Sequence, residues 1–330
     1  MTHPVLSVAM SVFNGERFLE SAIHSVLAQT FTDFEFLILD DGSRDGSRAI
    51  IEAAAARDSR IRPILRENRG LIASLNQLLA EARAPLVARM DADDFSLPER
   101  FAKQIAFLAA YPDHGVIGSY TRDIDENGEA HHNSGDDHPI THEAFIHNIE
   151  HGGPLLAHPS VIYRREAVLA AGGYHAAFRH CEDFDLWLRL AHRTRIANLP
   201  ERLLDYRHYA GQVSNRHAVE QQTGAAIARL AYAERQSGRP DPTEHLDRLP
   251  PLDQLDALFG REGVTREVRG VVARSLVYSP FALRGEGFDL LLRHVEDGGR
   301  GRDLWFTVPR LMRFGEPRRA ARLAAALARS

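Results

Sequence analysis

Cysteine and lysine are almost absent from this chain of 330 residues. The only cysteine, Cys181, excludes an intrachain disulfide framework and fits a reducing cytosol. Lys103 is the only lysine, and the formal net charge is -5. Because there is no basic excess, the composition argues against nucleic acid as a partner.

Long apolar runs and glycine-rich phosphate motifs are also missing. No uninterrupted apolar stretch approaches the roughly 20 residues that a membrane-spanning helix needs. The N-terminal region has no basic leader, so we expect no signal peptide and a cytoplasmic protein. Neither G-x-G-x-x-G after the first predicted strand nor G-x-x-x-x-G-K-[ST] occurs. This argues against the dinucleotide and P-loop phosphate cradles.

Apolar strands alternate with amphipathic helices in the N-terminal part of the chain. The predicted strands cover 5–12, 34–39, 61–65 and 86–90, and the predicted helices cover 16–29, 47–56 and 70–82. Such alternation implies a parallel sheet with right-handed crossovers, and ligands bind beyond the carboxyl ends of its strands. The turn at Phe13-Asn14-Gly15, the pair Asp40-Asp41 and the acids after residue 90 therefore share one rim.

Three carboxylates follow the fourth predicted strand, in the segment Asp91-Ala92-Asp93-Asp94. Acids this close repel one another, so a bound cation would explain them. Mg²⁺ and Mn²⁺ prefer oxygen ligands and often take only one or two carboxylates when phosphates supply the rest. We therefore predict a metal–diphosphate site. The alternative is an acidic loop that caps the next helix, where Ser96 and Pro98 fit an N-cap and a first turn.

A second acidic segment, Glu182-Asp183, precedes a run in which Phe184, Trp187 and Leu188 have helical spacing. The helix dipole favours an acid in the first turn, and capping alone would explain one of them. A carboxylate at this helix start could also serve as a general base.

Several motifs stand in a known order, and residues 5 to about 214 resemble the family 2 glycosyltransferases. The matching segments are Ser11–Gly15, Ser25–Thr30, Asp40–Ser47, Asn68–Gly70 with Asn76, Arg89–Asp94, Leu97–Arg100, Gly172–Tyr174 and Glu182–Arg189. The resemblance implies an α/β GT-A fold, with a Rossmann-like, mostly parallel sheet flanked by helices. Residues 1–214 would form this domain, and residues 215–330 a helical C-terminal region.

The resemblance also implies an inverting enzyme. It would move a sugar from a nucleotide-sugar donor of the UDP or dTDP type to a hydroxyl of a glycan or lipid-linked acceptor, in surface polysaccharide biosynthesis. Asp93, with Asp91, would hold Mn²⁺ or Mg²⁺, Asp183 would be the general base, and Glu182 would orient the acceptor or sugar. The implied nucleotide-sugar contacts are Ser11, Val12, Phe13, Asp40, Asp41, Asn68, Arg69, Asn76, Arg89, Asp91 and Ala92.

The chain departs from the family pattern in one place. Many relatives carry Tyr-Arg-x-His before a Gly-x-x-Ser turn, whereas this chain has Tyr206-Arg207-His208-Tyr209. His208 is one place early, and adjacent side chains of an extended segment face opposite ways. His208 is therefore a third metal ligand only if the loop bends. His158 is either an acceptor-side contact or a structural histidine.

The C-terminal region is predicted to be helical over 220–235, 245–259, 265–278, 288–294 and 317–328. Its last part, residues 300–330, is rich in arginine and aromatic residues, a composition that suits peripheral contact with the anionic inner face of the plasma membrane. The alternative is a packed helix with a solvated basic face.

Two other functions fit the same sheet. A non-catalytic nucleotide- or sugar-binding module would have no need of both acidic motifs. A nucleotidyltransferase usually carries a glycine-rich basic loop after the first strand, where this chain has Phe13–Arg17.

Overall fold

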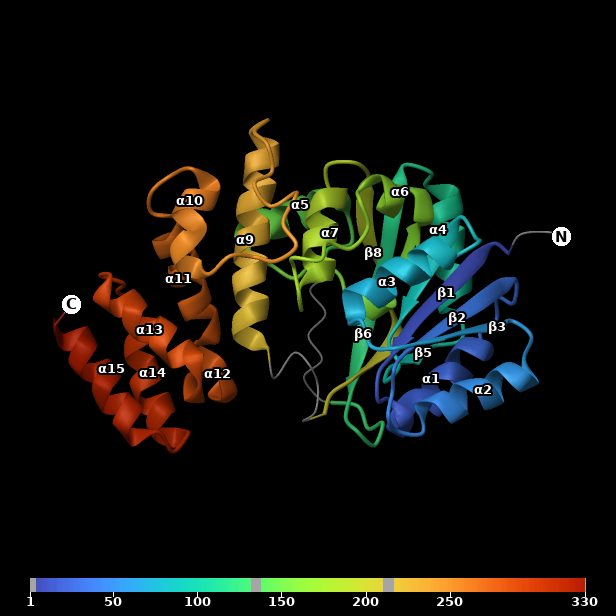
Figure 1. Cartoon of the computed structure of the whole chain (residues 1–330), viewed down its shortest axis with the longest axis horizontal. Helices are drawn as coiled ribbons and strands as arrows, with labels where there is room; N and C mark the ends of the chain where they lie inside the picture. The colour runs from blue at the N-terminus through green and yellow to red at the C-terminus, as the bar shows by residue number, and fades with distance from the viewer. Residues whose placement is uncertain (1–3, 132–137, 210–216, 330) are drawn as a thin grey trace. The chain divides into compact units, whose positions relative to one another are not determined.

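The computed structural model describes residues 4–131, 138–209 and 217–329 (Figure 1). By its internal contacts the chain divides into two compact units. The first comprises Met1–His175 and Leu186–Tyr209, and the second comprises Ala176–Asp185 and Ala210–Ser330. The contacts thus group residues 176–185 with the second unit, although the sequence places them in the N-terminal domain. The predicted boundary at residue 214 lies outside the described residues.

The first unit is built on an eight-stranded sheet with the order β3-β2-β1-β4-β7-β6-β8-β5. Pairing is parallel from β3 to β4 and between β6 and β8, while β7 is antiparallel to both of its neighbours and β5 to β8. The strands are β1 (Leu6–Val12), β2 (Phe34–Asp41), β3 (Ile61–Arg66), β4 (Leu86–Met90), β5 (Phe95–Ser96), β6 (His114–Ile124), β7 (Ile162–Arg164) and β8 (Arg195–Arg207).

Helices cover both faces of the parallel strands. Alternate side chains of β1 pack with α1, α2 and α4 in one apolar core, which includes Met10, Leu19 and Phe101. Helix α3 lies across the other face of β1 and β2 (Figure 1). This two-sided burial explains why these strands read as apolar runs. The helices are α1 (Glu16–Leu27), α2 (Ser47–Arg57), α3 (Leu71–Glu81), α4 (Arg100–Ala110), α5 (His142–His151), α6 (Arg165–Ala170) and α7 (Glu182–Leu190).

Two elements differ from the sequence-based expectation. The segments 196–199 and 203–206 belong to one strand, β8, because irregular pairing with β6 near Tyr120 lets the exposed Pro200–Arg202 stay within it. The helix expected over 245–259 is confined to α10 (Leu255–Phe259), because Pro250 and Pro251 interrupt a longer helix.

The second unit is helical over its described residues. Its apolar core is formed by Ala273, Val277, Leu283, Phe288, Leu291, Leu292, Val295, Leu304, Leu311, Ala320, Leu323 and Leu327. Within the described ranges, no helix combines the length and the apolar character needed to cross a bilayer. Besides α10, its longer helices are α9 (Ala218–Gln236), α11 (Val264–Ser275), α12 (Pro280–Arg284), α13 (Glu286–Glu296), α14 (Arg302–Arg313) and α15 (Pro317–Arg329).

Candidate active site

The loops after β1 and β2 are joined by hydrogen bonds at the rim of the sheet. Asn14, in a left-handed conformation with φ 53°, donates its backbone N–H to Ser43 Oγ at 2.9 Å and accepts the Arg44 N–H at 2.8 Å. Gly15 N–H donates to Ser47 Oγ at 2.8 Å. These bonds fix the backbone after Ser11 and Val12 and leave the Phe13 side chain 53% exposed.

The two acids at the end of β2 have different partners. Asp40 accepts the Ser43 N–H at 3.1 Å. Asp41 accepts the N–H groups of Arg69 and Gly70 at 3.0 and 2.8 Å, and its Oδ1 lies 2.7 Å from an Arg66 guanidinium nitrogen. The Asn68 amide donates to the Asp41 carbonyl at 2.9 Å. Asp41 and Asn68, which the resemblance assigns to nucleotide binding, thus tie the β3–α3 loop to β2.

We expect Asp41→Asn to lower the free energy of unfolding by about 2–4 kcal/mol, because it leaves the Arg66 guanidinium, whose side chain is only 10% exposed, without its carboxylate. Urea unfolding measures the loss. As a control, Glu52→Gln removes an exposed ion pair with Arg48 and should change stability by less than about 1 kcal/mol. Equal losses in both variants would contradict a structural role for Asp41.

A buried arginine orients the first acid after β4. Arg89 is 1% exposed, and its guanidinium donates to Asp91 Oδ1 at 2.5 Å and to the Met90 carbonyl. Burial alone would lower the pKa of Arg89, but Asp91 and the nearby tyrosines outweigh burial and raise it. Arg100, also buried, donates to the Arg89 carbonyl at 2.7 Å. The resemblance assigns Arg89 to the nucleotide-sugar, and in the structure its side chain holds the acidic turn.

Of the other two acids of the turn, Asp94 is buried and Asp93 is partly buried, and the surroundings of each raise its pKa. Burial and the neighbouring Asp91 raise the pKa of Asp93 to about 6. Burial, Asp93 and Asp91 raise the pKa of Asp94 well above its usual range. Asp94 Oδ1 accepts the Arg207 N–H at 2.9 Å, and Asp94 Oδ2 has no hydrogen-bond partner among the described residues. At Asp93 and Asp94, burial and the neighbouring acids therefore outweigh the nearby arginine charges.

Tyr209 contacts the acidic turn, and His208 has a different partner. The Tyr209 hydroxyl donates to Asp93 Oδ2 at 2.9 Å, and its ring packs on Phe18 with centroids 5.3 Å apart. His208 Nε2 lies 3.2 Å from Asp123 Oδ1. His208, the candidate for a third metal ligand, is thus paired with Asp123. Adjacent side chains of this extended segment face opposite ways, so the side chain of Tyr209, and not that of His208, reaches the acidic turn. The Gly211–Ser214 turn lies outside the described residues.

The segment after the acidic turn is held by the Ser25–Thr30 motif. Gln29 Nε2 donates to the Leu97 carbonyl at 2.8 Å, and Gln29 Oε1 accepts the Phe101 N–H at 3.1 Å. Ser25 Oγ accepts the Ser96 N–H at 3.0 Å. This motif therefore anchors the segment that directly follows the acidic turn.

The Gly172–Tyr174 turn connects several other motif residues. The Asn76 amide pairs with both backbone groups of Tyr174, each at 2.8 Å, and Gly173 lies too close to Asn76 to carry a Cβ without a shift. The Tyr174 hydroxyl lies 3.0 Å from His158 Nε2, and Arg189 donates to the Gly173 carbonyl at 2.8 Å. Asn76 thus has a structural partner, although the resemblance assigns it to the nucleotide.

Glu182 and Asp183 open helix α7, as the sequence spacing predicts. Glu182 is 5% exposed, and Asp183 is partly buried. Burial, followed by the charges of Glu182 and Asp183, raises the pKa of the preceding Cys181 thiol well above its usual range. Cys181 is thus a buried thiol rather than a thiolate nucleophile.

Comparisons with known proteins identify the family. Residues 7–170 match the family model for glycosyl transferase family 2. The amylovoran biosynthesis glycosyltransferase AmsE of Erwinia amylovora is 31% identical over 271 residues, which cover 78% of this chain and 99% of AmsE. The chain belongs to glycosyltransferase family 2. The O-antigen biosynthesis glycosyltransferase WbnJ of Escherichia coli is 31% identical over 62% of this chain and 79% of WbnJ.

A solved structure with the same fold is the mannosyltransferase PcManGT of Pyrobaculum calidifontis, in complex with GDP-Man and Mn²⁺. Its TM-score is 0.54 at 14% identity, and the match covers 99% of this chain and 88% of PcManGT. The glycosyltransferase therefore has the GT-A fold predicted from its sequence, with a helical C-terminal region.

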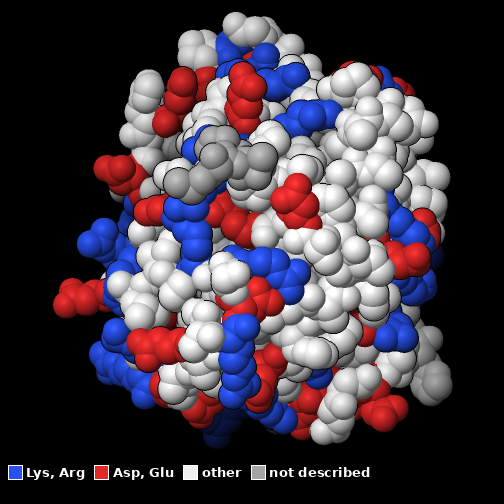
Figure 2. Space-filling view, turned by 90° about the vertical axis from the view of Figure 1, so that its right-hand side faces the viewer, with Lys and Arg blue, Asp and Glu red and all other residues white. Residues whose placement is uncertain are grey.

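The residues of the acidic turn fit a divalent cation. Asp91 and Asp93 remain partly exposed, supply hard oxygen donors, and are oriented by Arg89 and Tyr209. Burial and Asp91 raise the pKa of Asp93, and a bound divalent cation would favour its charged form. The face shown in Figure 2 carries interspersed acidic and basic side chains rather than a basic tract.

Sequence reasoning missed Tyr209 as a neighbour of the acidic turn. The signal was present, because Tyr209 occupies the place where relatives carry histidine. Its pKa is raised by burial and by Asp93, so its hydroxyl stays protonated and acts as a donor.

Proposed function

We propose that this glycosyltransferase catalyses a metal-assisted, inverting transfer from a nucleoside-diphosphate sugar of the UDP or dTDP type. The acceptor is a hydroxyl of a glycan or lipid-linked glycan, in surface polysaccharide biosynthesis. The pair Asp91 and Asp93 carries the proposal, because Arg89 and Tyr209 orient the two carboxylates and the pKa of Asp93 is raised. The relative named for O-antigen biosynthesis and the neighbour bound to GDP-Man and Mn²⁺ support it.

In this proposal each residue of the site has its own role. Asp93 and Asp91 would hold Mn²⁺ or Mg²⁺, which as a Lewis acid would neutralise charge on the departing diphosphate. Arg89 and Tyr209 fix these two carboxylates in place. Asp183 takes the proton of the attacking acceptor hydroxyl, and Glu182 orients acceptor or sugar. Attack from the face opposite the diphosphate inverts the configuration.

A thermal-shift screen tests the donor half of the proposal. UDP, dTDP, GDP and CMP are each added with Mn²⁺, with Mg²⁺ or with EDTA. A ligand that binds only the folded state stabilises it by mass action and so raises the melting temperature. At a ligand concentration of 100 times Kd, the free energy of unfolding increases by about 2.7 kcal/mol. We expect a shift from UDP or dTDP that needs the metal. A metal-independent shift, or none with any nucleotide, would contradict the proposal.

The non-catalytic alternative predicts a different pair of results. A binding module would show the same metal-dependent shift but release no nucleoside diphosphate from a donor sugar. Measuring nucleotide release with the donor that gives the shift, with and without glycan acceptors, therefore separates the two functions.

Helix α14 has an exposed side with aromatic and basic residues. Its buried side holds Leu304 and Leu311, whereas Trp305, Phe306 and Met312 on the other side are 50%, 60% and 56% exposed. The exposed side also carries Arg302 and Arg313. We propose that this side lies on an anionic membrane surface, where a lipid-linked acceptor would be reached.

We expect the double variant Trp305→Ser/Phe306→Ser to float poorly with vesicles that contain anionic lipid, while the wild type floats with them. The control is Phe281→Ser, which removes an aromatic side chain that is 59% exposed on α12. Deleting 300–330 would be a weaker test, because Leu304, Leu311 and Leu323 belong to the unit's core. Equal flotation of the wild type and the double variant would contradict membrane contact through α14.

A further inference from the structure

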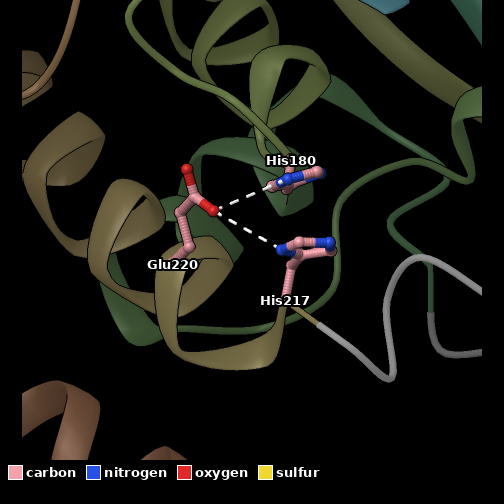
Figure 3. Close-up of side chains that lie close together, drawn as sticks. All are labelled: His180, His217 and Glu220. Atoms are coloured by element: carbon pink, nitrogen blue, oxygen red, sulfur yellow. Dashed lines mark ion pairs between the residues drawn. The ribbon is translucent and has the colours of Figure 1, made fainter. Parts of the chain in front are cut away.

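Two histidines and one glutamate of the second unit lie close together, with both imidazole rings beside the Glu220 carboxylate (Figure 3). His180 precedes α7, whereas His217 and Glu220 lie one turn apart at the start of α9. His180 Nε2 lies 3.5 Å from Glu220 Oε2, and His217 Nδ1 lies 3.6 Å from the same oxygen. All three possible ligand atoms lie within 4.8 Å of one another.

These separations fit a shared cation better than hydrogen bonds. Good N–H···O bonds measure about 2.7–3.2 Å, and both distances exceed this range. Zn–N and Zn–O bonds of about 2.0–2.2 Å in a tetrahedron place neighbouring ligand atoms about 3.3–3.6 Å apart. Both contacts of Glu220 Oε2 lie within that range.

The two imidazole rings are stacked face to face. Their centroids are 3.9 Å apart and their planes differ by 16°, so protonating both rings would place two positive charges face to face. Neutral imidazoles are the form that binds a metal. Because metal–imidazole bonds lie in the plane of the ring, one of the two rings turns about its side-chain torsions when both nitrogens bind one ion.

His180 carries a second, independent indication. Its backbone has φ 65°, in the left-handed region that non-glycine residues rarely adopt. Its Nε2 is buried without a hydrogen-bond partner among the described residues. The nearest acceptor of this nitrogen, Glu220 Oε2 at 3.5 Å, is too far for a good hydrogen bond, and a metal ion would satisfy both atoms.

We propose that His180, His217 and Glu220 form a Zn²⁺ site that shares no residue with the acidic turn, with water completing the coordination. Two nitrogens and one carboxylate oxygen suit Zn²⁺ better than Mg²⁺ or Mn²⁺. The exposed sides of His217 and Glu220 give the ion a path from solvent. Because His180 lies two residues before Glu182, the ion fixes the segment that leads into α7 to the start of α9.

The binding test uses Zn²⁺ alone and needs no nucleotide or acceptor, so failure of the proposed transferase function would leave its result intact. The test uses the Asp93→Asn variant, because this substitution reduces metal binding at the acidic turn. The variant is stripped of metal with EDTA, and its Zn²⁺ binding is measured by calorimetric titration. We expect one equivalent to bind, and Co²⁺ to give the intense visible absorption of a four-coordinate site. His217→Ala and Glu220→Gln should each weaken Zn²⁺ binding at least 10-fold.

A second stacked histidine pair provides the matched control. His147 and His151 on α5 have centroids 4.0 Å apart, and His151 Nδ1 lies 2.8 Å from the His147 carbonyl. His151→Ala should leave Zn²⁺ binding unchanged. Circular dichroism confirms that each variant is folded. Zn²⁺ affinity that survives His217→Ala and Glu220→Gln, or that falls with His151→Ala, would overturn the assignment.

If the transferase function holds, His217→Ala should also lower kcat while leaving the metal-dependent nucleotide shift unchanged. This second readout rests on the proposed role of Asp183, since the ion would act by positioning the start of α7. Unchanged kcat together with lost Zn²⁺ binding would overturn the positioning role and leave the metal site standing.

Discussion

Asp93→Asn is expected to abolish the metal-dependent rise in melting temperature that a nucleoside diphosphate produces, together with sugar transfer. The amide has lost the charge that attracts a hard divalent cation. It keeps an oxygen that can accept the Tyr209 hydroxyl, which donates to Asp93 Oδ2 at 2.9 Å. The variant therefore removes one ligand charge while preserving the local hydrogen bond, and loss of the shift would reflect the metal rather than a collapsed loop.

The same variant should make the metal-free protein more stable above about pH 6. The pKa of Asp93 is raised to about 6 by burial and by Asp91, against about 3.9 for an unfolded aspartate. A raised carboxyl pKa means that the folded state binds the proton more tightly. The stability that this tighter proton binding gives the folded state is fully present below about pH 3.9 and is lost as the pH rises through about 6. In EDTA at pH 8, Asp93→Asn should gain about 1–3 kcal/mol over the wild type.

Urea unfolding in EDTA at pH 4 and pH 8 checks this pH dependence, because the gain should nearly vanish at pH 4. The control is Asp123→Asn, which removes a nearby acid paired with His208 rather than one in the acidic turn. If Asp93→Asn were less stable than the wild type in EDTA at pH 8, the surrounding groups would already stabilise the charged Asp93 carboxylate without a metal.

The parallel half of the fold could be predicted because its strands are covered on both faces. The predicted ends of β1 and β4 agree with the structure to within a residue, since the apolar runs stop where burial stops. The later elements were harder to predict. Strand β8 includes the exposed Pro200–Arg202, and α5 has only Phe145 and Ile149 fully buried. Neither leaves a continuous apolar pattern in the sequence.

The candidate site shows a similar limit. Order and spacing predict that Asp40, Asp41 and Asp91 lie at one rim, because parallel strands end together. They do not reveal which partner each side chain takes. Asp41 contacts residues 25 to 29 positions away, and Tyr209 contacts Asp93 across 116 positions. Such contacts depend on the folded geometry, which the local pattern does not contain.

Asp183→Asn is expected to reduce kcat for sugar transfer by about 10²- to 10⁴-fold, the usual contribution of a general base. The metal-dependent nucleotide shift should remain, because the assigned donor contacts and metal ligands belong to other segments. KM for the donor should change little, since the lost interaction is made only as the acceptor hydroxyl gives up its proton. Initial rates with saturating donor and acceptor, beside thermal shifts on the same samples, measure both effects.

A helix-capping role for Asp183 predicts the opposite pattern. Losing a first-turn acid costs about 0.3–1 kcal/mol of stability through the helix dipole and has no reason to affect turnover. Asp289→Asn is the matched control, since Asp289 is an exposed first-turn acid of α13. Both variants should lose similar stability, and only Asp183→Asn should lose turnover. Near-normal kcat in Asp183→Asn would transfer the base assignment to another carboxylate, and Glu182→Gln would then be the variant to measure.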